Sequence, residues 1–553
     1  MSADLIILNG RLVTFDRNRP TASALAIRDG RILAVGDTAE MRLLAGPATR
    51  YVDAAGGTVL PGFIDSHVHL FGGSVELDYL NLYGVRGLDT LTARVRAWAA
   101  ECPDDKVVFA VQADYTILGD GVATTRQALD QVMPDRPFAM FAPDHHTMWA
   151  NTRALELVGF LHGAQVDQGS EIMMAADGTA TGELREPAAY GPVLALTRFG
   201  GRELLGMVSG SDPVPPATPA QRALDKAALI YGLKHCAAQG ITGLHNMDGN
   251  FYQLELLSEL EAEGELLCRT EIPFHFKNFD KIERFEEAVE MRRRYQGDWV
   301  WCNRVKMFID GVVESSTALM LEPYPGLETY GDAVFTQEHF NAAVVKADEL
   351  GFQLAVHAIG DAGIRWTLDA YELARKTNGA RDSRHRIEHI EILHPDDLPR
   401  FKDLGVVASI QPGHAPFGGV FPPGGVAKML HPRQISTAYA WQDIRATGTP
   451  VIFSTDWPVI GVEVMPTIKA AIAPVDLGSP WRDQTQSLHD TLESYTAMNA
   501  WVEFNEERKG KLMPGMMADI AVMSHDLENL PAAEITQARC ITTIAGGRIT
   551  YQA

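Results

Sequence analysis

Residues 60–69 read Leu60-Pro61-Gly62-Phe63-Ile64-Asp65-Ser66-His67-Val68-His69, a short apolar run that ends in two histidines. In a β-strand, side chains at positions i and i+2 point to the same face. A strand here would present His67 and His69 side by side, as a chelating pair for a metal ion. Two unrelated histidines would give the same pattern, so the pair does not decide the question alone. The strands predicted later in the chain help to decide between these two interpretations, because several of them also end in a residue that can bind a metal.

The composition is that of a soluble globular protein: 553 residues, of which 46% are hydrophobic and 22% charged. The formal net charge of −23 disfavours nucleic acid or an anionic membrane as a partner. The five cysteines are dispersed and form no Cys-x-x-Cys pair, which indicates reduced thiols. No signal peptide or membrane-spanning run is visible. We therefore expect a cytoplasmic protein, and a homodimer is the default for a large enzyme of this kind.

Both ends of the chain are rich in short strands separated by glycine turns. The N-terminal strands are expected at 5–9, 11–14, 24–27, 31–35 and 51–52, and the C-terminal ones at 519–523, 540–545 and 548–551. This pattern predicts that residues 1–58 and 511–553 meet in one small β-sandwich.

Between these ends, strands alternate with helical stretches. Strands are expected at 60–67, 241–245, 269–276, 304–310, 352–357, 386–390, 405–411 and 450–456. Eight strands with helical crossovers predict an α/β fold, a (β/α)₈ or TIM barrel over residues 59–510. Residues 72–220 are too long for a loop, so we expect an inserted subdomain between barrel strands 1 and 2.

Barrel enzymes keep their chemistry at the carboxyl ends of the strands. There the chain places Lys306, His357, His389 and Asp456, in addition to the histidine pair. Each residue alone has a structural explanation: His357 as a core histidine, Asp456 as a helix cap, Lys306 as a paired or snorkelling lysine. Their common position at strand ends makes a shared metal site the better interpretation.

These residues lie in motifs that resemble the amidohydrolase superfamily, and most of all its YtcJ-like and N-substituted formamide deformylase-like branch, the amidohydrolase 3 family. The motifs are Pro61–His69, Asp144–Asn151, Val305–Gly311, His357–Asp361, Arg386–His389, Ser454–Val459 and Pro514–Ile520. The resemblance covers nearly the whole chain, with Thr455 at a position where serine is commoner. It implies a distorted TIM barrel with a β-sandwich made from both termini.

The resemblance implies that His67, His69 and Asp456 bind one metal ion and that His357 and His389 bind a second. The expected metal is zinc. Lys306 matches a position that is carbamylated in many relatives and then bridges two metals. A carbamylated lysine (N6-carboxylysine) acts as a carboxylate, and burial beside cations favours the neutral amine that must react with carbon dioxide. A mononuclear site with an unmodified lysine is the alternative.

A divalent ion lowers the pKa of a bound water and supplies hydroxide, and Asp456 would act as the general acid and base. Candidates for substrate contact are His146 and Asn151 in the insertion, His245 and Gln411 at strand ends, and Trp457. For His146 and Asn151, structural hydrogen bonding within the insertion is an equal alternative, and Trp457 could equally be packing.

The sequence thus predicts a metal-dependent hydrolase of a C–N bond, in an amide, N-formyl or cyclic amide small molecule. Two alternatives remain: the same site hydrolysing an ester or carbamate or deaminating a ring, and a non-catalytic protein on this fold. Fold analogy does not identify the substrate.

Overall fold

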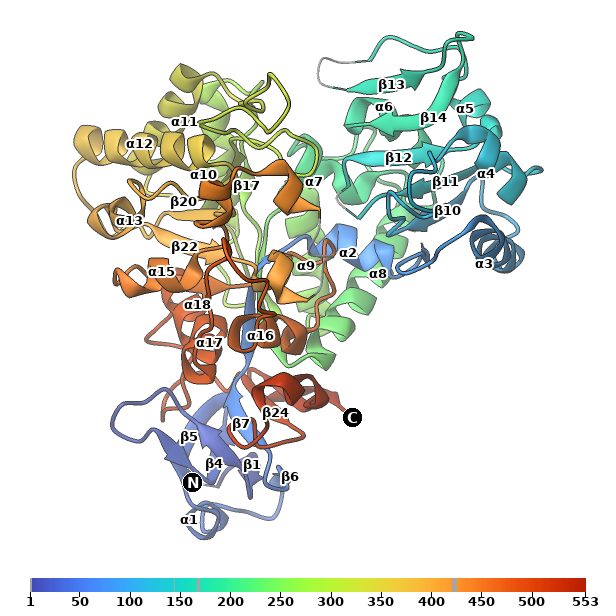
Figure 1. The fold of residues 1–553 in the computed structure, drawn as a ribbon. Helices are drawn as coiled ribbons and strands as arrows, with labels where there is room; N and C mark the ends of the chain where they lie inside the picture. The colour runs from blue at the N-terminus through green and yellow to red at the C-terminus, as the bar shows by residue number, and fades with distance from the viewer. Residues whose placement is uncertain (1, 144, 167–169, 420–424) are drawn as a thin grey trace. The chain divides into compact units, whose positions relative to one another are not determined.

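The computed structural model describes residues 2–143, 145–166, 170–419 and 425–553 (Figure 1). The chain divides into two compact units. The first unit comprises residues 1–68 and 233–553, and the second comprises residues 69–232. The insertion expected at 72–220 falls inside the second unit.

The stretch around Gly62 passes from one sheet of the first unit to another. β7 (Thr58–Pro61) pairs with β24 (Ile520–Met523), whereas β8 (Phe63–Val68) pairs with β15 (Ile241–Asn246). A Cβ atom at Gly62 would lie 2.2 Å from the Thr242 side chain, so only glycine allows this close approach. The boundary expected between residues 58 and 59 therefore falls inside a strand, and the polypeptide changes sheet at Gly62.

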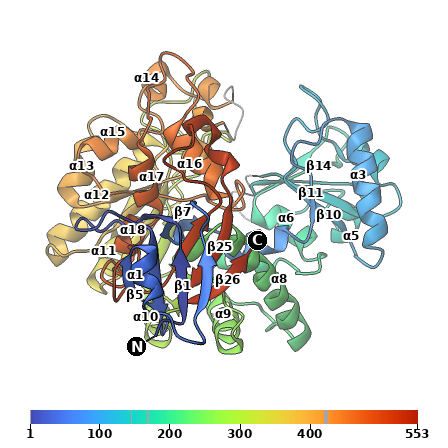
Figure 2. The same ribbon diagram turned by 90° about the horizontal axis from the view of Figure 1, so that it is seen from below.

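The two ends of the chain build two neighbouring sheets in the first unit. Their strand orders are β5-β4-β1-β6 and β26-β25-β24-β7-β2-β3. The strands not yet given are β1 (Leu5–Leu8), β2 (Arg11–Val13), β3 (Thr21–Ala22), β4 (Ala24–Arg28), β5 (Arg31–Gly36), β6 (Arg50–Asp53), β25 (Cys540–Ala545) and β26 (Arg548–Gln552). Figures 1 and 2 show the blue N-terminal strands beside the red C-terminal ones. One apolar cluster joins both sheets, with Ile7 and Leu25 from the first and Val59 and Ile520 from the second.

The middle of the first unit contains two sheets of parallel strands. One has the order β18-β16-β15-β8, and the other β17-β19-β20-β21-β22-β23. The remaining strands are β16 (Arg269–Glu271), β17 (Phe274–His275), β18 (Val300–Trp301), β19 (Arg304–Phe308), β20 (Gln353–Ala358), β21 (Arg386–His389), β22 (Val407–Ile410) and β23 (Val451–Phe453). Among the described residues no ladder joins the two sheets, although an isolated parallel bridge links Val68 with Trp457. The structure thus has an α/β fold with the expected parallel strands, and closure into a barrel stays a prediction.

The single strand expected at 269–276 is wrong, because it forms two short strands in different sheets. β16 pairs with β15 and β18, whereas β17 pairs with β19. Pro273 lies between them, and it has no N–H group to donate to a ladder.

Helices occupy most of the connections between these strands, and standard caps mark several of their ends. At α9 (Phe251–Glu263), the Asn250 side chain accepts from the amide of Gln253, and Gly264 ends the helix at φ 77°. The others include α8 (Pro219–Ala238), α10 (Phe285–Arg294), α11 (Gln337–Glu349), α12 (Asp361–Asn378), α13 (Leu398–Leu404), α15 (Trp441–Ala446), α16 (Val464–Ile472), α17 (Leu488–Tyr495) and α18 (Ala497–Val502). No helix in the described part of the chain is both long and apolar enough to span a membrane.

The second unit has a sheet of its own with the order β13-β14-β12-β11-β10-β9. These strands are β9 (Leu80–Asn81), β10 (Val108–Val111), β11 (Phe138–Phe141), β12 (Thr147–Ala150), β13 (Glu171–Met174) and β14 (Ala180–Arg185). Its helices include α2 (Leu70–Glu76), α3 (Leu88–Glu101), α4 (Arg126–Val132), α5 (Thr152–Val158) and α6 (Pro187–Leu194). Leu91 and Val95 of α3 pack with Leu129 of α4 and Phe138 of β11 in a separate apolar core.

Candidate metal centre

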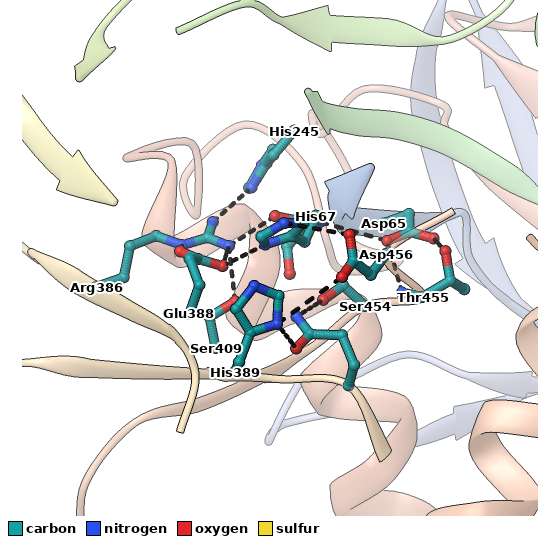
Figure 3. A network of polar contacts seen from close by, with 12 residues as sticks. Asp65, His67, His245, Arg386, Glu388, His389, Ser409, Ser454, Thr455 and Asp456 are labelled. Carbon is teal, nitrogen blue, oxygen red and sulfur yellow. Dashed lines mark hydrogen bonds and ion pairs between the residues drawn. The ribbon is translucent and has the colours of Figure 1, made fainter. Parts of the chain in front are cut away.

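Three side chains that can bind a metal converge in the first unit (Figure 3). His67 comes from β8, His389 ends β21, and Asp456 follows β23. One potential ligand atom of each lies within 4.8 Å of the others, and all three side chains are buried. His67 Nε2 is 3.4 Å from Asp456 Oδ1, and the two imidazole centroids are 4.8 Å apart.

The backbone at this cluster adopts conformations that are uncommon for residues other than glycine. Asp456 has φ 65° and His389 has φ 76°. A left-handed backbone conformation costs free energy in such residues. It is found where a side chain must point in a different direction from the regular side chains of its strand. The Asp456 amide donates to the His67 carbonyl at 2.9 Å, which fixes the end of β8 to the segment after β23.

Glu388 orients the imidazole of His67. Its Oε2 lies 2.7 Å from His67 Nδ1 and accepts a second hydrogen bond from Arg386 Nη2, also at 2.7 Å. Burial opposes ionisation of Glu388, but the Arg386 charge and the His67 contact together lower its pKa well below the ordinary value. The carboxylate therefore holds the proton on Nδ1 and leaves the Nε2 lone pair directed at Asp456.

Burial and the nearby charge of Lys306 keep the cluster histidines neutral. Burial is the larger cause and lowers the pKa of His67 to about 4, although the Asp456 charge opposes it. Burial and then the neighbouring imidazoles also lower the pKa of His389 well below its ordinary value. A neutral imidazole is the form that binds a metal ion.

Gln411 performs the same orienting task for His389. Its amide nitrogen donates to Ser454 Oγ at 2.8 Å, which directs its carbonyl oxygen to His389 Nδ1 at 2.9 Å. The side chain is only 1% exposed and both its ends are engaged, and its place in the substrate pocket stays a prediction.

His357 and Lys306 lie beside the cluster: His357 is in β20, the neighbour of β21, and Lys306 is in β19, on the far side of β20. The ring of His357 is 4.5 Å from that of His389, and its Nε2 contacts the Gly311 carbonyl at 3.1 Å. Lys306 Nζ is buried without a hydrogen-bond partner and lies 4.5 Å from the centroid of Phe308. Burial lowers the pKa of Lys306 to about 8, although the charges of Glu388 and Asp456 oppose the shift.

His245, a predicted pocket residue, contacts two charged side chains. It is completely buried, with Nδ1 at 3.1 Å from Arg386 Nη1 and Nε2 at 2.9 Å from Glu503 Oε2 (Figure 3). Arg386 also donates to the Ser66 carbonyl and to Ser409 Oγ, both at 2.7 Å. His245 is thus part of a buried network that reaches the cluster through Arg386.

Thr455 and Asp65 brace the other side of Asp456. Thr455 Oγ1 donates to Asp65 Oδ2 at 2.6 Å, and the Thr455 amide donates to Oδ1 at 3.0 Å. Burial raises the pKa of Asp65 to about 7, and the Thr455 hydrogen bonds oppose this shift. The hydroxyl of threonine donates here as that of serine would, so the departure noted at Thr455 changes nothing essential.

The predicted residues of the second unit differ in their surroundings. Asn151 is wholly buried and caps α5, and it makes four hydrogen bonds, to Phe138 N, Ala154 N, Met133 O and Arg136 O. Its hydrogen-bonding capacity is therefore filled, which favours the structural alternative, and the substrate contact stays a prediction. His146 Nδ1 lies 2.9 Å from Glu186 Oε1, and the His146 side chain is partly exposed.

His69 begins this unit, directly before α2, and stays a predicted ligand.

Trp457 stays a predicted substrate contact. Its side chain is buried, and its ring lies 6.0 Å from that of His235.

His414 lies next to the cluster and was missed by the sequence analysis. It ends the short helix η3 (Pro412–His414), and its ring is nearly parallel to that of His389. Its Nε2 is 3.8 Å from Asp456 Oδ2, and its Nδ1 is 3.7 Å from Glu391 Oε1. Its position three residues beyond Gln411, after another strand end, was the available signal. Arg386 and Glu388 were also missed as supports, although both stand in a motif that the analysis quoted.

Comparison with known proteins agrees with the resemblance read from the sequence. The model of the amidohydrolase family (Amidohydro_3) matches residues 50–551. The chain belongs to this family.

Relatives at moderate identity cover nearly all of this amidohydrolase. It is 28% identical to Protein LONG AFTER FAR-RED 3 of Arabidopsis thaliana, over 99% of this chain and 92% of that one. It is 26% identical to the N-substituted formamide deformylase of Arthrobacter pascens, over 99% and 98% of the two chains. A solved structure, an uncharacterized metal-dependent hydrolase from Pyrococcus horikoshii, superposes with a TM-score of 0.71 at 25% identity, covering 93% of this chain and 96% of that one.

Proposed function

We propose that this amidohydrolase is a metal-dependent hydrolase that cleaves the C–N bond of a small amide, N-formyl or cyclic amide compound. The observation that carries the proposal is the buried convergence of His67, His389 and Asp456 from three separate strands. Two neutral imidazoles and a carboxylate are a donor set that suits zinc and similar divalent ions.

The proposed site binds a second ion. His67, His69 and Asp456 would hold one ion, and His357 and His389 the other. The buried amine of Lys306 lacks a hydrogen-bond partner. Its lowered pKa favours the neutral form, which can react with carbon dioxide to give a carboxylate between the two sites. We further propose that the two parallel sheets close into a distorted barrel, with the Val68–Trp457 bridge at the seam.

A divalent ion held by these residues would supply the Lewis acidity that lowers the pKa of a water molecule toward neutrality. Asp456 would orient the water, take up its proton and pass it to the leaving nitrogen. Glu388 and Gln411 keep the two imidazoles in the tautomers that the site needs, each through a contact to Nδ1. One relative is named N-substituted formamide deformylase, and this name supports the choice of a C–N bond over an ester bond.

The test is the metal content of protein purified without added metal, together with activity on a panel of N-acyl and N-formyl compounds. We expect about two zinc-like ions per chain, loss of activity on chelation, and a fall in kcat of about 10²–10⁴-fold in Asp456→Asn. About one ion per chain would instead indicate a mononuclear site with an unmodified Lys306.

Asp519→Asn is the matched control for this experiment. Asp519 is also a buried carboxylate of the first unit, but it pairs with Arg269 through Nε at 2.8 Å, away from the cluster. It should lose stability without losing metal. Absence of metal from wild-type protein, with no effect of chelator on any activity found, would overturn the hydrolase mechanism.

A further inference from the structure

Lys277 stands at the same sheet edge as the metal centre but takes no part in it. It follows β17 by two residues, and β17 pairs with β19 so that His275 is opposite Lys306. The Phe276 amide donates to the Lys306 carbonyl at 3.0 Å, which extends this pairing toward Lys277. Because the strands are parallel, Lys277 comes level with Phe308, at the carboxyl edge where β20 and β21 end.

The aromatic ring of Phe308 holds this second amine at the edge of the site. Lys277 Nζ lies 5.2 Å from the ring centroid, and Lys306 Nζ lies 4.5 Å from the same centroid. The ring of His357, a proposed metal ligand, is 4.7 Å from that of Phe308. Cation–π attraction therefore keeps the Lys277 ammonium next to the groups that would hold the metal.

The Lys277 ammonium forms no direct ion pair within the described part of the chain, although the Asp248 charge acts on it from farther away. Among the residues that the structure describes, no carboxylate oxygen lies within 4.0 Å of Lys277 Nζ. The nearby Asp280 carboxylate is engaged elsewhere: it accepts from the Lys277 amide at 2.7 Å and from the guanidinium of Arg284. Burial lowers the pKa of Lys277 to about 7, although the charges of Asp248 and Asp280 oppose the shift.

The overall charge of the chain makes such a cation more significant. At a formal net charge of −23, the protein repels anionic ligands at long range. A substrate with a negative group would therefore need a local cation, and a lysine with a purely structural role would be expected to pair with a carboxylate.

We propose that Lys277 binds a carboxylate of the substrate, so that the amide hydrolysed by this enzyme is one that carries an acidic group, such as an N-acyl or N-formyl amino acid. The inference rests on the proposed function and specifies its substrate class. The salt bridge would form on binding and persist through the reaction, so it contributes mainly to KM.

The test compares each N-acyl amino acid with its uncharged primary amide, using wild type, Lys277→Met and Lys277→Arg. Methionine keeps most of the length and apolar volume of the side chain and removes its charge. We expect the ratio of kcat/KM for acid over amide to fall about 10–100-fold in Lys277→Met, mostly through KM, and to recover in part in Lys277→Arg. The control Lys346→Met removes an exposed lysine of α11, paired with Glu349, and should leave the ratio as in wild type.

Direct binding separates this inference from the proposed function. Calorimetric titration with N-acetyl amino acids needs no turnover, so it reports on Lys277 even if the wild type hydrolyses none of the panel. Binding that is at least tenfold weaker in Lys277→Met, with an unchanged melting temperature and metal content, supports the role of Lys277. An unchanged acid-to-amide ratio, or equal binding by wild type and Lys277→Met, would overturn it.

Discussion

Glu388 in the first unit and Asn151 in the second are both completely buried polar side chains, but their partners come from different distances along the chain. Glu388 contacts His67, which is 321 residues away, through its carboxylate. The Asn151 side chain bonds only to groups within 18 residues, and all four are backbone atoms. One side chain connects distant strands, and the other completes a local turn.

This difference distinguishes a functional polar group from a structural one better than residue type or burial does. Local backbone partners satisfy Asn151 completely, which leaves it nothing to offer a ligand. The partners of Glu388 include an imidazole whose other nitrogen faces Asp456. A buried polar residue that aims a second polar residue at a shared point indicates a site.

The largest effect should come from Glu388→Gln. The change leaves the buried Arg386 without its carboxylate, which costs about 3–5 kcal/mol of stability. It also removes the acceptor that holds the proton on His67 Nδ1, so metal affinity should fall about 10–100-fold. Chemical denaturation and competition with a metal-binding dye measure the two effects separately.

Glu503→Gln controls for the loss of a buried charge alone. Glu503 is paired with Lys509 at 2.6 Å and with His245, which has no contact with Asp456. This variant should lose stability but keep its metal affinity. Equal loss of metal in both variants would show that Glu388 acts through general stability and not through His67.

The residues that converge were largely predictable from sequence, because parallel strands place their ends at one edge. His67, Lys306, His357, His389 and Asp456 all follow from that rule. The supports were harder to find, since Arg386 and Glu388 form their contacts through chain pairings that no local pattern encodes. His245 shows the limit most clearly: it lies in a strand as expected, but only the tertiary structure shows that Arg386 and Glu503 enclose it.

The fold shows the same division between local and non-local signals. Alternation of apolar residues located the strands, and Gly62 and Pro273 then redirected two of them into different sheets. In each case the decisive event is steric: a close approach to Thr242 at Gly62, and a missing N–H at Pro273. The sheet that a strand joins depends on these events, which hydrophobic periodicity does not report.

The second prediction tests Asn151 as a structural residue. Asn151→Ala removes four hydrogen bonds and leaves buried backbone groups at Phe138, Met133 and Arg136 without partners. The second unit should lose about 3 kcal/mol of stability, while kcat/KM at a temperature well below the melting transition stays as in wild type. Differential scanning calorimetry and steady-state assays measure the two quantities. A drop in kcat/KM without loss of stability would support the predicted role in substrate binding.

The smallest effect, and the only gain, should come from Glu203→Gln in the second unit. Glu203 is 3% exposed, and its Oε2 has no hydrogen-bond partner among the described residues. This buried oxygen therefore lacks the hydrogen bonds that stabilise the carboxylate of Glu388. Burial raises the pKa of Glu203 from 4.5 to about 7. Below pH 4.5 the acid is protonated in both states, and as the pH rises toward 7 only the unfolded state ionises freely, so stability is lost across this window.

Glutamine does not titrate, so the stability advantage of Glu203→Gln should grow by about 2 kcal/mol between pH 5 and pH 7 and then level off. Urea denaturation of both proteins at several pH values measures this difference. Glu388→Gln provides the contrast, because the lowered pKa of Glu388 makes its ionised form stabilising, and its loss should be most costly at neutral pH. An advantage of Glu203→Gln that does not change with pH would mean that Glu203 is already ionised in the folded protein and is paired or hydrated there.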